Sequence, residues 1–458
     1  MVGHMVNETY FKRKLENYLQ LWRTRTDRKP LVIRGARQVG KSTLVQHFGK
    51  SYPYFISLNL ERPEHQRIFK SGNSTKNIVD AIFLQSGTRR TKQQTLIFID
   101  EIQAAPYAIQ QLRYLYEDHP ELHIIAAGSL LEFAFDRAVS FPVGRVEQVL
   151  LHPFDFEEFL LATGHTMAYE ALRTIPISEY AHSQLLEFFH QFALVGGMPA
   201  AIQTYVAEGH ASNIPFIYQQ IWKSFTDDVE KYARNIKERN LIRHLMRLAP
   251  QQPDRVNFST LTKGKYTTVA ISEAFEAIDQ SRVIRLIYPT TSVTVPASID
   301  LRKRPRLQFL DTGMLIHALN LGGEIPLLDD LSSLTKGRII QHLVAQEFLA
   351  QFHQPLYDFR FWVREKASST AEVDLVHPYQ NILIPIETKA GKQGRLRSLQ
   401  LFVDAAGSRF AIRLLANTFS KESVKTRAGT PYVLYNLPYY LAGQLPRYFD
   451  WIVSEDNL

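Results

Sequence analysis

The sequence predicts an α/β fold in which a mostly parallel sheet is covered by helices on both faces. Two observations lead to this prediction. Short apolar runs recur through the first third of the chain and are separated by helical patterns, which is the spacing of βαβ units with parallel strands. The first apolar run also passes directly into a glycine-rich loop and then into a helical pattern, LVIRGARQVGKSTLVQHF. Buried strands are therefore expected at residues 31–33, 54–60, 95–100, 123–129 and 146–151.

The composition limits the class of protein. At 458 residues, 45% of them hydrophobic, the chain is long enough for two or three domains that each bury a core. It has no cysteine, so neither disulfides nor thiolate chemistry operate, and the reducing cytoplasm is the expected compartment. No apolar run approaches the roughly 18 residues that span a bilayer, so no membrane partner is expected. The net charge of +8 permits nucleic-acid binding without establishing it.

The N-terminal segment is expected to contribute a helix and not a targeting signal. It lacks the apolar core of a signal peptide. Residues 1–4 are consistent with a cloning remnant, which would start the native chain near Met5. An amphipathic pattern predicts a helix over Glu8–Trp22, and another helix is expected from Pro106 to about Glu117.

The glycine-rich loop has the pattern of a phosphate-binding loop, G-x-x-x-x-G-K-[ST]. Glycine lets the backbone wrap closely, so that amide N–H groups form a nest for phosphate oxygens, and the N-terminus of the following helix adds a favourable field for an anion. Lys41 would contact the β- and γ-phosphates, and the Ser42 hydroxyl would bind Mg²⁺. The alternative, a glycine/lysine turn before a helix, is disfavoured by the strand–loop–helix context. The nucleotide-binding residues are expected to be Gly35, Ala36, Arg37, Gln38, Val39, Gly40, Lys41, Ser42 and Thr43.

Two adjacent carboxylates end a later strand. Residues 95–103 read TLIFIDEIQ, an apolar run that finishes in Asp100 and Glu101. An acidic residue at the end of a neighbouring strand completes the magnesium site of such a loop, and a second one polarises the attacking water. We therefore expect Asp100 to bind the metal and Glu101 to act as general base; the alternative is a strand end that happens to be acidic. Together with the loop, these residues predict a protein that binds a nucleoside triphosphate, with ATP and Mg²⁺ as its cofactors.

The tip of the fourth expected strand offers a further candidate. The run HIIAAGS ends in a small polar pair. Ser129 at this tip is expected to lie beside the γ-phosphate and to sense the state of the nucleotide. A simple helix N-cap is an equally good interpretation of Ser129.

An ordered series of motifs runs through nearly the whole chain. The motifs are GARQVGKST, IFIDEIQ, AAGSLLEF, the Gly144–Arg145 pair, HPFDFEEF, GGMP, FLDTGML, AEVDLV and IPIETK. Their series resembles a group of bacterial and archaeal ATPases of the AAA+ class that are joined to a C-terminal domain of unknown function. The resemblance implies ATP hydrolysis. It also implies that Arg145 reaches a γ-phosphate, often that of a neighbouring subunit in a homo-oligomer, whereas an ion pair with a nearby carboxylate is the alternative for Arg145.

Four parts are expected along the chain. Residues 1–152 form the ATPase core with its N-terminal helix. Aromatic residues at helical spacing within residues 153–235 predict helices with buried faces, interpreted as a lid-like part. Residues 236–320 contain three short helical patterns and a strand over residues 283–288, which suggest a winged helix-turn-helix, as the resemblance also implies. Residues 321–458 form a C-terminal α/β domain.

Basic residues of the third part are candidates for contact with DNA or RNA. Lys263, Lys265 and Arg282 are expected to face phosphates, although winged helices also serve as plain protein-packing modules. The tract Arg302–Arg306 is the most concentrated positive charge in the chain. It is interpreted as a solvated loop or strand edge, with contact to a polyanion as the alternative.

Two strands near the C-terminus carry a second set of charged residues. Alternation predicts strands over residues 371–376 and 381–389, and a hairpin between them would bring Asp374 beside Glu387. Glu387 and Lys389 share one face because strand side chains repeat every two residues. Two carboxylates on adjacent strands hold Mg²⁺ in metal-assisted phosphodiesterases, where a lysine orients or activates the attacking water. The spacing resembles the PD-(D/E)XK nucleases, which implies a restriction-endonuclease-like fold; a cross-strand ion pair is the alternative.

Three features bear on whether this domain cleaves nucleic acid. Relatives usually carry Glu-Asn where this chain has Gln341-His342, and an amide is a poorer metal ligand than a carboxylate. Glu347 lies roughly 120° away around the predicted helix and need not replace it. Pro385 predicts an edge strand or a bulge. The expected function is therefore an ATPase coupled to nucleic-acid binding or processing, with nuclease activity left open. The alternative is a nucleotide-dependent switch whose C-terminal domain is a catalytically silent binding module for protein or DNA.

Overall fold

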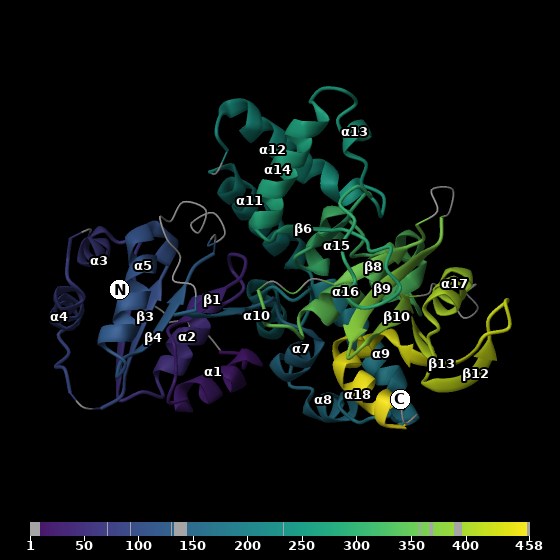
Figure 1. Ribbon diagram of the computed structural model, residues 1–458, viewed down its shortest axis with the longest axis horizontal. Helices are drawn as coiled ribbons and strands as arrows, with labels where there is room; N and C mark the ends of the chain where they lie inside the picture. The colour runs from purple at the N-terminus through teal and green to yellow at the C-terminus, as the bar shows by residue number, and fades with distance from the viewer. Residues whose placement is uncertain are drawn as a thin grey trace. The chain divides into compact units, whose positions relative to one another are not determined.

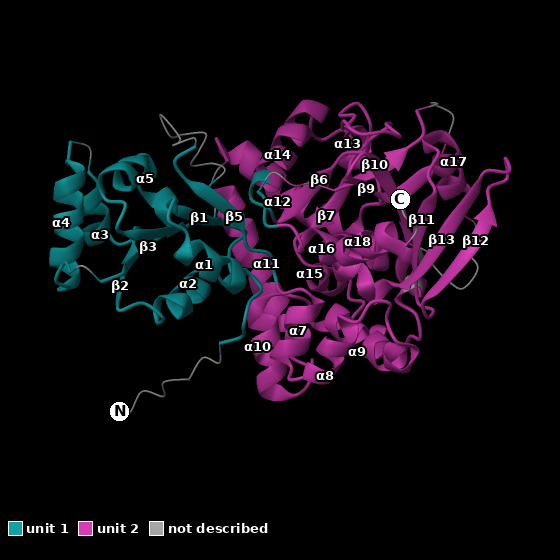
Figure 2. Cartoon of the chain, turned by 60° about the horizontal axis from the view of Figure 1, so that its bottom comes forward, with its two compact units in different colours: residues 1–153, 280–282, 353–356 teal, residues 154–279, 283–352, 357–458 magenta. Residues whose placement is uncertain are grey.

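The computed structural model describes residues 10–455, apart from residues 71, 92, 130, 132–143, 232, 356, 358, 366–369 and 389–395 (Figure 1). The chain forms two compact units, which Figure 2 draws in different colours. Unit 1 comprises residues 1–153, 280–282 and 353–356, and unit 2 comprises residues 154–279, 283–352 and 357–458. The division into four parts stays a prediction.

Unit 1 is built on a five-stranded parallel sheet. The strands are β1 (Leu31–Arg34), β2 (Tyr54–Asn59), β3 (Thr95–Asp100), β4 (His123–Ala127) and β5 (Glu147–Leu150). Their order across the sheet is β2-β3-β4-β1-β5, and each neighbouring pair is parallel. The five expected strands and the parallel sheet are thus confirmed.

Helices cover this sheet. They are α1 (Leu15–Thr24), α2 (Lys41–Gly49), α3 (Pro63–Gln66), α4 (Thr75–Ser86) and α5 (Pro106–Asp118). Helices α4 and α5 share a core with one face of the strands, which includes Val32 and Ile97. The alternate residues Ile33 and Phe98 are buried as well, so the strands are apolar on both faces, as in α/β proteins. The helix expected from Glu8 begins at Leu15 in the described chain.

The first part of unit 2 is helical, as expected for residues 153–235. Its helices are α7 (Phe156–Ala162), α8 (Thr166–Leu172), α9 (His182–Val195), α10 (Pro199–Glu208) and α11 (Ile214–Glu230). The Glu347 carboxylate lies at the start of α7, where its two oxygens accept from the Phe156 N–H at 3.2 and 3.0 Å. Glu347 therefore faces α7 and does not replace Gln341. The lid-like role of these helices stays a prediction.

The next segment contains the expected three helices and a strand. Its elements are α12 (Ile236–Leu248), α13 (Phe258–Leu261), α14 (Thr268–Gln280), β6 (Ile284–Ile287), β7 (Arg306–Phe309) and α15 (Thr312–Ala318). Strand β6 pairs with β7 in antiparallel orientation, with Ile284 opposite Phe309. The winged helix-turn-helix itself stays a prediction.

A six-stranded mixed sheet forms the C-terminal part of unit 2. The elements are α16 (Arg338–Leu349), β8 (Arg360–Val363), β9 (Glu372–Tyr379), β10 (Ile382–Thr388), α17 (Arg397–Ala406), β11 (Phe410–Leu415), β12 (Ser420–Lys425), β13 (Pro431–Pro438) and α18 (Leu445–Glu455). The strand order is β12-β13-β11-β10-β9-β8. Strands β9 and β10 form the expected antiparallel hairpin, with Leu375 opposite Ile386.

The expectation that Pro385 marks an edge or a bulge is wrong. Strand β10 lies between β9 and β11, and its pairing with β9 continues through Pro385 without a shift of register. The parallel pairing with β11 begins at Ile386, one residue later. The residue that has no N–H to donate thus lies just outside that parallel ladder.

Short 3₁₀ helices complete the described chain. They are η1 (Arg67–Phe69), η2 (Ile102–Ala104), η3 (Glu179–Ala181), η4 (Ala249–Gln251), η5 (Ile325–Leu327), η6 (Leu331–Gly337) and η7 (Tyr439–Gln444). Within the described residues, no single helix is long and apolar enough to cross a membrane. Among the helices of the described ranges, one bent pair, formed by residues 179–195 and 199–208, has the required length and composition.

One buried carboxylate joins several helices of unit 2. Asp311 caps the N-terminus of α15 and is fully buried. It accepts hydrogen bonds from the Gly197 N–H and the Tyr218 hydroxyl, both at 2.6 Å, and from the Gln346 amide at 3.4 Å. Burial raises the pKa of Asp311, and the Tyr218 and backbone donors oppose that rise. The α9–α10 junction, α11, α15 and α16 therefore meet at one carboxylate.

The GGMP motif fits closely around this carboxylate. A Cβ at Gly196 would lie 1.8 Å from the Tyr218 hydroxyl oxygen and 2.5 Å from Asp311 Oδ1. Gly196 also has φ +76° and ψ 179°, a backbone region that essentially only glycine adopts. The motif therefore serves packing around Asp311.

Replacement of Gly196 tests this packing. We expect Gly196→Ala to lower the free energy of unfolding by about 3 kcal/mol, because the methyl group overlaps Tyr218 and the backbone disfavours an L-residue. Gly209→Ala is the matched control: its φ is +74°, its Cβ would meet nothing within 4 Å, and it should cost about 1 kcal/mol. Urea unfolding followed by intrinsic fluorescence measures both. Equal losses would contradict the packing role.

Candidate functional site

The glycine-rich loop connects the end of β1 to the start of α2. Gly40 is the N-cap of α2 and has φ +95°. A Cβ at Gly35 would lie 2.4 Å from the Leu151 carbonyl oxygen, so a side chain does not fit where the loop passes the end of β5. Lys41 is buried, and its Nζ donates to the carbonyl oxygens of Gly35 and Ala36 at 3.0 and 2.8 Å. The ammonium group is thus held within the loop.

Asp100 lies at the end of β3 and contacts this loop. The Ser42 hydroxyl lies near its carboxylate, and the Glu101 N–H donates to Asp100 Oδ1 at 3.1 Å. Burial raises the pKa of Asp100, as does the nearby Glu101 carboxylate, whereas the Ser42 hydroxyl and the Lys41 ammonium lower it. A hydroxyl and a carboxylate are the oxygen ligands that Mg²⁺ prefers. These residues therefore fit the expected metal.

The Glu101 side chain is held by a residue that sequence analysis did not single out. Glu101 has φ +51°, and Gln103 Nε2 donates to its Oε2 at 2.5 Å. Gln103 Oε1 is buried and has no hydrogen-bond partner among the described residues. The one signal in the sequence was the position of Gln103, two residues after Glu101 in IFIDEIQ.

Ser129 lies close to the end of β4 and is buried. Strand β4 pairs with β3 on one side and with β1 on the other. Because the carboxyl ends of parallel strands meet at one edge of a sheet, Ser129 lies at the same edge as Asp100 and the loop. A role for Ser129 in sensing the nucleotide stays a prediction.

Arg145 lies at the opposite edge of this sheet. It precedes β5, whose first residue pairs with Leu31 at the start of β1. Arg145 Nε forms an ion pair with Glu117 Oε1 at 2.8 Å, and Arg113 shares the same carboxylate. This contact is the ion pair that the sequence left open as an alternative. The structure thus places Arg145 away from the loop of its own unit, and a role toward a neighbouring subunit stays a prediction.

Arg13 is a second residue that sequence analysis missed. It is buried, and it donates from Nη1 to the Val39 carbonyl at 2.9 Å and from Nη2 to the His152 carbonyl at 2.7 Å. It therefore ties the glycine-rich loop to the segment that follows β5. In the sequence Arg13 is one cation of a basic run, FKRK, and no pattern distinguishes it from its neighbours.

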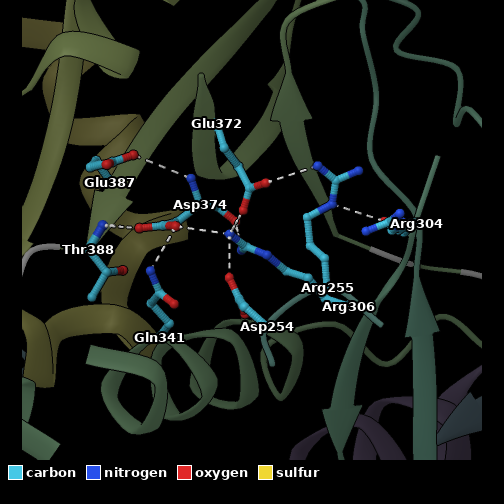
Figure 3. A network of polar contacts seen from close by, with 9 residues as sticks. All are labelled: Asp254, Arg255, Arg304, Arg306, Gln341, Glu372, Asp374, Glu387 and Thr388. Atoms are coloured by element: carbon cyan, nitrogen blue, oxygen red, sulfur yellow. Dashed lines mark hydrogen bonds and ion pairs between the residues drawn. The ribbon is translucent and has the colours of Figure 1, made fainter. Parts of the chain in front are cut away.

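The C-terminal hairpin brings Asp374 and Glu387 together, as expected from alternation. The Asp374 N–H lies 3.4 Å from Glu387 Oε2. The Asp374 carboxylate accepts from the Thr388 N–H at 2.9 Å and from the Gln341 amide at 3.0 Å (Figure 3). Lys389 lies outside the described residues. The metal-binding roles of Asp374 and Glu387 stay predictions.

Arg306 points toward an acidic cluster formed by Asp254, Glu372 and Asp374 (Figure 3). Its Nη2 lies 3.2 Å from Asp374 Oδ1 and 3.3 Å from Asp254 Oδ2, and it also donates to Glu372. The expectation that the tract Arg302–Arg306 is a solvated loop is wrong for Arg306, which is buried as the first residue of β7. Sequence analysis missed the acidic cluster, although the period of two places Glu372 on the same face as Asp374.

The other basic candidates differ in their surroundings. Lys263 and Lys265 are exposed in the turn between α13 and α14. Arg282 is half-buried and donates from Nη2 to the Pro355 carbonyl at 3.1 Å. This contact directs one nitrogen of the guanidinium toward the protein, and contact of Arg282 with a phosphate stays a prediction.

Comparison with known protein families identifies the first part of the chain. An AAA domain model matches residues 27–160, which contain the glycine-rich loop, Asp100 and Glu101. Two domains of unknown function match the remainder, DUF8612 at residues 186–324 and DUF4143 at residues 336–433. No curated protein matches the chain.

Three solved structures show distant similarity. A Walker-type ATPase of Pyrococcus abyssi has a TM-score of 0.44 and 15% identity, over 68% of this chain and 97% of that one. A signal transduction ATPase with a tetratricopeptide repeat sensor, from Pyrococcus horikoshii, has a TM-score of 0.28 and 13% identity, over 74% and 48%. The Hsp104–ADP complex of S. cerevisiae has a TM-score of 0.27 and 13% identity, over 60% and 40%.

These structural likenesses are too distant to assign a function, and the chain spans less than half of the last two proteins. The family model and the geometry of the glycine-rich loop both indicate a P-loop ATPase domain, without the solved structures. Residues 27–160 are therefore an AAA-type P-loop ATPase domain.

Proposed function

We propose that the AAA domain hydrolyses ATP, with Ser42 and Asp100 holding Mg²⁺ and Glu101 acting as the general base. The observation that carries this proposal is the position of Asp100 at the end of β3, near the Ser42 hydroxyl of the loop. Two kinds of oxygen group that magnesium prefers thus lie near each other. When bound, Mg²⁺ supplies positive charge that offsets the charge of the phosphates.

Each residue of this site has a physical role in the proposed reaction. The amides of the loop and the N-terminus of α2 bind phosphate oxygens. Lys41, which donates to two loop carbonyls, exchanges these partners for the β- and γ-phosphates. Glu101 accepts a proton from the attacking water, and Gln103 orients the accepting carboxylate. Ser129 senses the γ-phosphate from the same edge of the sheet.

The proposed partner is a nucleic acid, DNA or RNA, that unit 2 binds or processes. Lys263 and Lys265 are exposed on a turn between two helices, and the net charge of +8 suits a polyanion. A homo-oligomer belongs to the same proposal. Because Arg145 lies at the sheet edge away from its own loop, the γ-phosphate that it reaches is that of a neighbouring subunit.

A second candidate is a nucleotide-dependent switch whose C-terminal domain binds its partner without catalysis. The observation that favours it is the contact between Arg306 Nη2 and Asp374 Oδ1 at 3.2 Å. Asp374 is one of the two metal ligands that the nuclease-like spacing predicts, and it already forms an ion pair with a guanidinium. In this switch, ATP hydrolysis changes the affinity for the partner and no phosphodiester bond is cleaved.

Two substitutions separate nucleotide binding from hydrolysis. We expect Lys41→Ala to weaken ATP binding, because the phosphates lose a buried cation. We expect Glu101→Gln to retain binding but to lower kcat at least about a hundredfold, because the general base is lost. Binding of a fluorescent ATP analogue and release of inorganic phosphate measure the two effects. Normal hydrolysis by Glu101→Gln would contradict the assignment of the base.

Gln103→Ala tests the residue that holds Glu101. We expect kcat to fall about tenfold with little change in the KM for ATP, the effect of one lost hydrogen bond to a charged group. Gln66→Ala is the matched control, because Gln66 Nε2 donates to the carbonyl of Ala104, the neighbour of Gln103 in η2, at 2.7 Å. An equal effect of both substitutions, or a change in KM alone, would argue against a positioning role.

Charge reversal tests the nucleic-acid partner. We expect Lys263→Glu with Lys265→Glu to weaken duplex DNA binding roughly tenfold or more, because two phosphate contacts are lost, and to reduce its dependence on salt. The control is Lys70→Glu with Lys76→Glu, which makes the same change of charge at exposed sites of unit 1. Fluorescence anisotropy with labelled DNA measures both. Equal weakening by the two pairs would show that only the net charge matters.

A further inference from the structure

The acidic cluster surrounds one nitrogen of Arg306. Its three carboxylates come from two separate segments: Asp254 precedes α13, whereas Glu372 and Asp374 lie on β9. We infer that the Arg306 guanidinium holds the place of a metal ion in this cluster, so that the C-terminal domain does not bind a divalent cation through Asp374 while Arg306 is present. This inference deepens the second proposed function and does not depend on ATP hydrolysis.

The contacts of Arg306 resemble the coordination of a cation more than a surface ion pair. Nη2 alone contacts all three carboxylates of the acidic cluster. Nη1 donates to the Asp374 backbone carbonyl at 3.2 Å, and Nε is buried and has no hydrogen-bond partner among the described residues. In a metal centre, carboxylates from separate segments converge on one cation in the same way. Here they converge on the tip of a side chain.

The charges explain why a cation is required at this position. Buried carboxylates are costly unless positive charge compensates them. A guanidinium stays protonated in proteins, so Arg306 brings a permanent positive charge to the three carboxylates that its Nη2 contacts. Arg306 therefore supplies positive charge at the position where a nuclease would hold a metal ion.

The predicted metal ligands are also engaged by donors of the protein. Asp374 Oδ1 accepts from Gln341 as well as from Arg306, and Oδ2 accepts from the Thr388 N–H (Figure 3). The Glu387 carboxylate is buried and faces the Asp374 N–H. Mg²⁺ needs oxygen ligands at about 2.0–2.1 Å. The N–H donors and the positive guanidinium occupy the space around these oxygens that the metal ion would need. The residues present therefore do not fit Mg²⁺.

Arg306 is held in this position by the surrounding structure. Its guanidinium lies 4.4 Å from the centre of the Phe361 ring, a distance at which a cation is attracted to an aromatic face. The preceding Pro305 carbonyl accepts from the Val256 N–H at 2.9 Å. At the other end of β7, the Phe309 N–H donates to His342 Nε2 at 2.7 Å. The strand that carries Arg306 is thus held at both ends, and the guanidinium itself packs on Phe361.

Titration with Mn²⁺ tests the inference. Free Mn²⁺ is measured by electron paramagnetic resonance with the full chain in the absence of nucleotide, and binding is assigned to the acidic cluster only where Asp374→Asn abolishes it. We expect wild type to show no Asp374-dependent binding. We expect Arg306→Gln to gain an Asp374-dependent site at least tenfold tighter than any in wild type, because three carboxylates lose their resident cation. The double variant Arg306→Gln with Asp374→Asn should lose it.

Two matched variants serve as controls. Arg306→Lys keeps a positive charge and should resemble wild type, as should Arg304→Gln, which makes the same change of charge at an exposed neighbour. Asp374-dependent Mn²⁺ binding by wild type would overturn the inference, and this comparison holds even if Arg306→Gln does not fold. A folded Arg306→Gln that gains no site would overturn it too. ATP hydrolysis by the same samples is a separate readout, so its loss would bear on the AAA domain alone.

Discussion

The buried carboxylate of Asp311 is the contact on which unit 2 depends. A buried anion is tolerated only where donors surround it, so the segments that supply those donors must meet. One of these donors is the Gln346 side chain of α16. Its oxygen also accepts from the N–H and the hydroxyl of Thr312 at 2.5 and 2.7 Å, which fixes α16 against the start of α15. The same helix directs Gln341 to Asp374 and His342 to the N–H of Phe309. Through α16, the position of β7 and of Arg306 is thus linked to Asp311 at the start of α15.

Local patterns were sufficient to predict much of the fold. The five strands of unit 1 follow from short apolar runs, and the contact between Asp374 and Glu387 follows from alternation and a tight turn. The roles of Arg13 and Arg306 were missed because their partners lie far away in the sequence, and a charge within a basic run is usually solvated. The expectation for Pro385 was wrong because a missing N–H weakens a strand only where a neighbouring strand would accept from it. Which residues of β10 pair with β11 is decided only in the assembled sheet.

The two units surround a strand carboxylate with partners of different charge. Asp100 at the end of β3 lies near the neutral hydroxyl of Ser42, and a hydroxyl oxygen can also serve as a metal ligand. Asp374 on β9 forms an ion pair with the guanidinium of Arg306. A guanidinium has no lone pair for a metal ion and remains charged. The first arrangement allows the carboxylate and its partner to bind one metal together. In the second, the partner is itself the cation, and a metal must displace it.

The GGMP and FLDTGML motifs contribute to the family resemblance of the sequence, yet Gly196, Gly197 and Asp311 serve the interior of unit 2. These motifs therefore report how the helices pack and not what the surface binds. A chain without any of the candidate catalytic groups would still need them in order to fold. A resemblance that rests on these motifs thus indicates a shared fold, whereas the chemistry depends on other positions, such as Arg306 and Gln341.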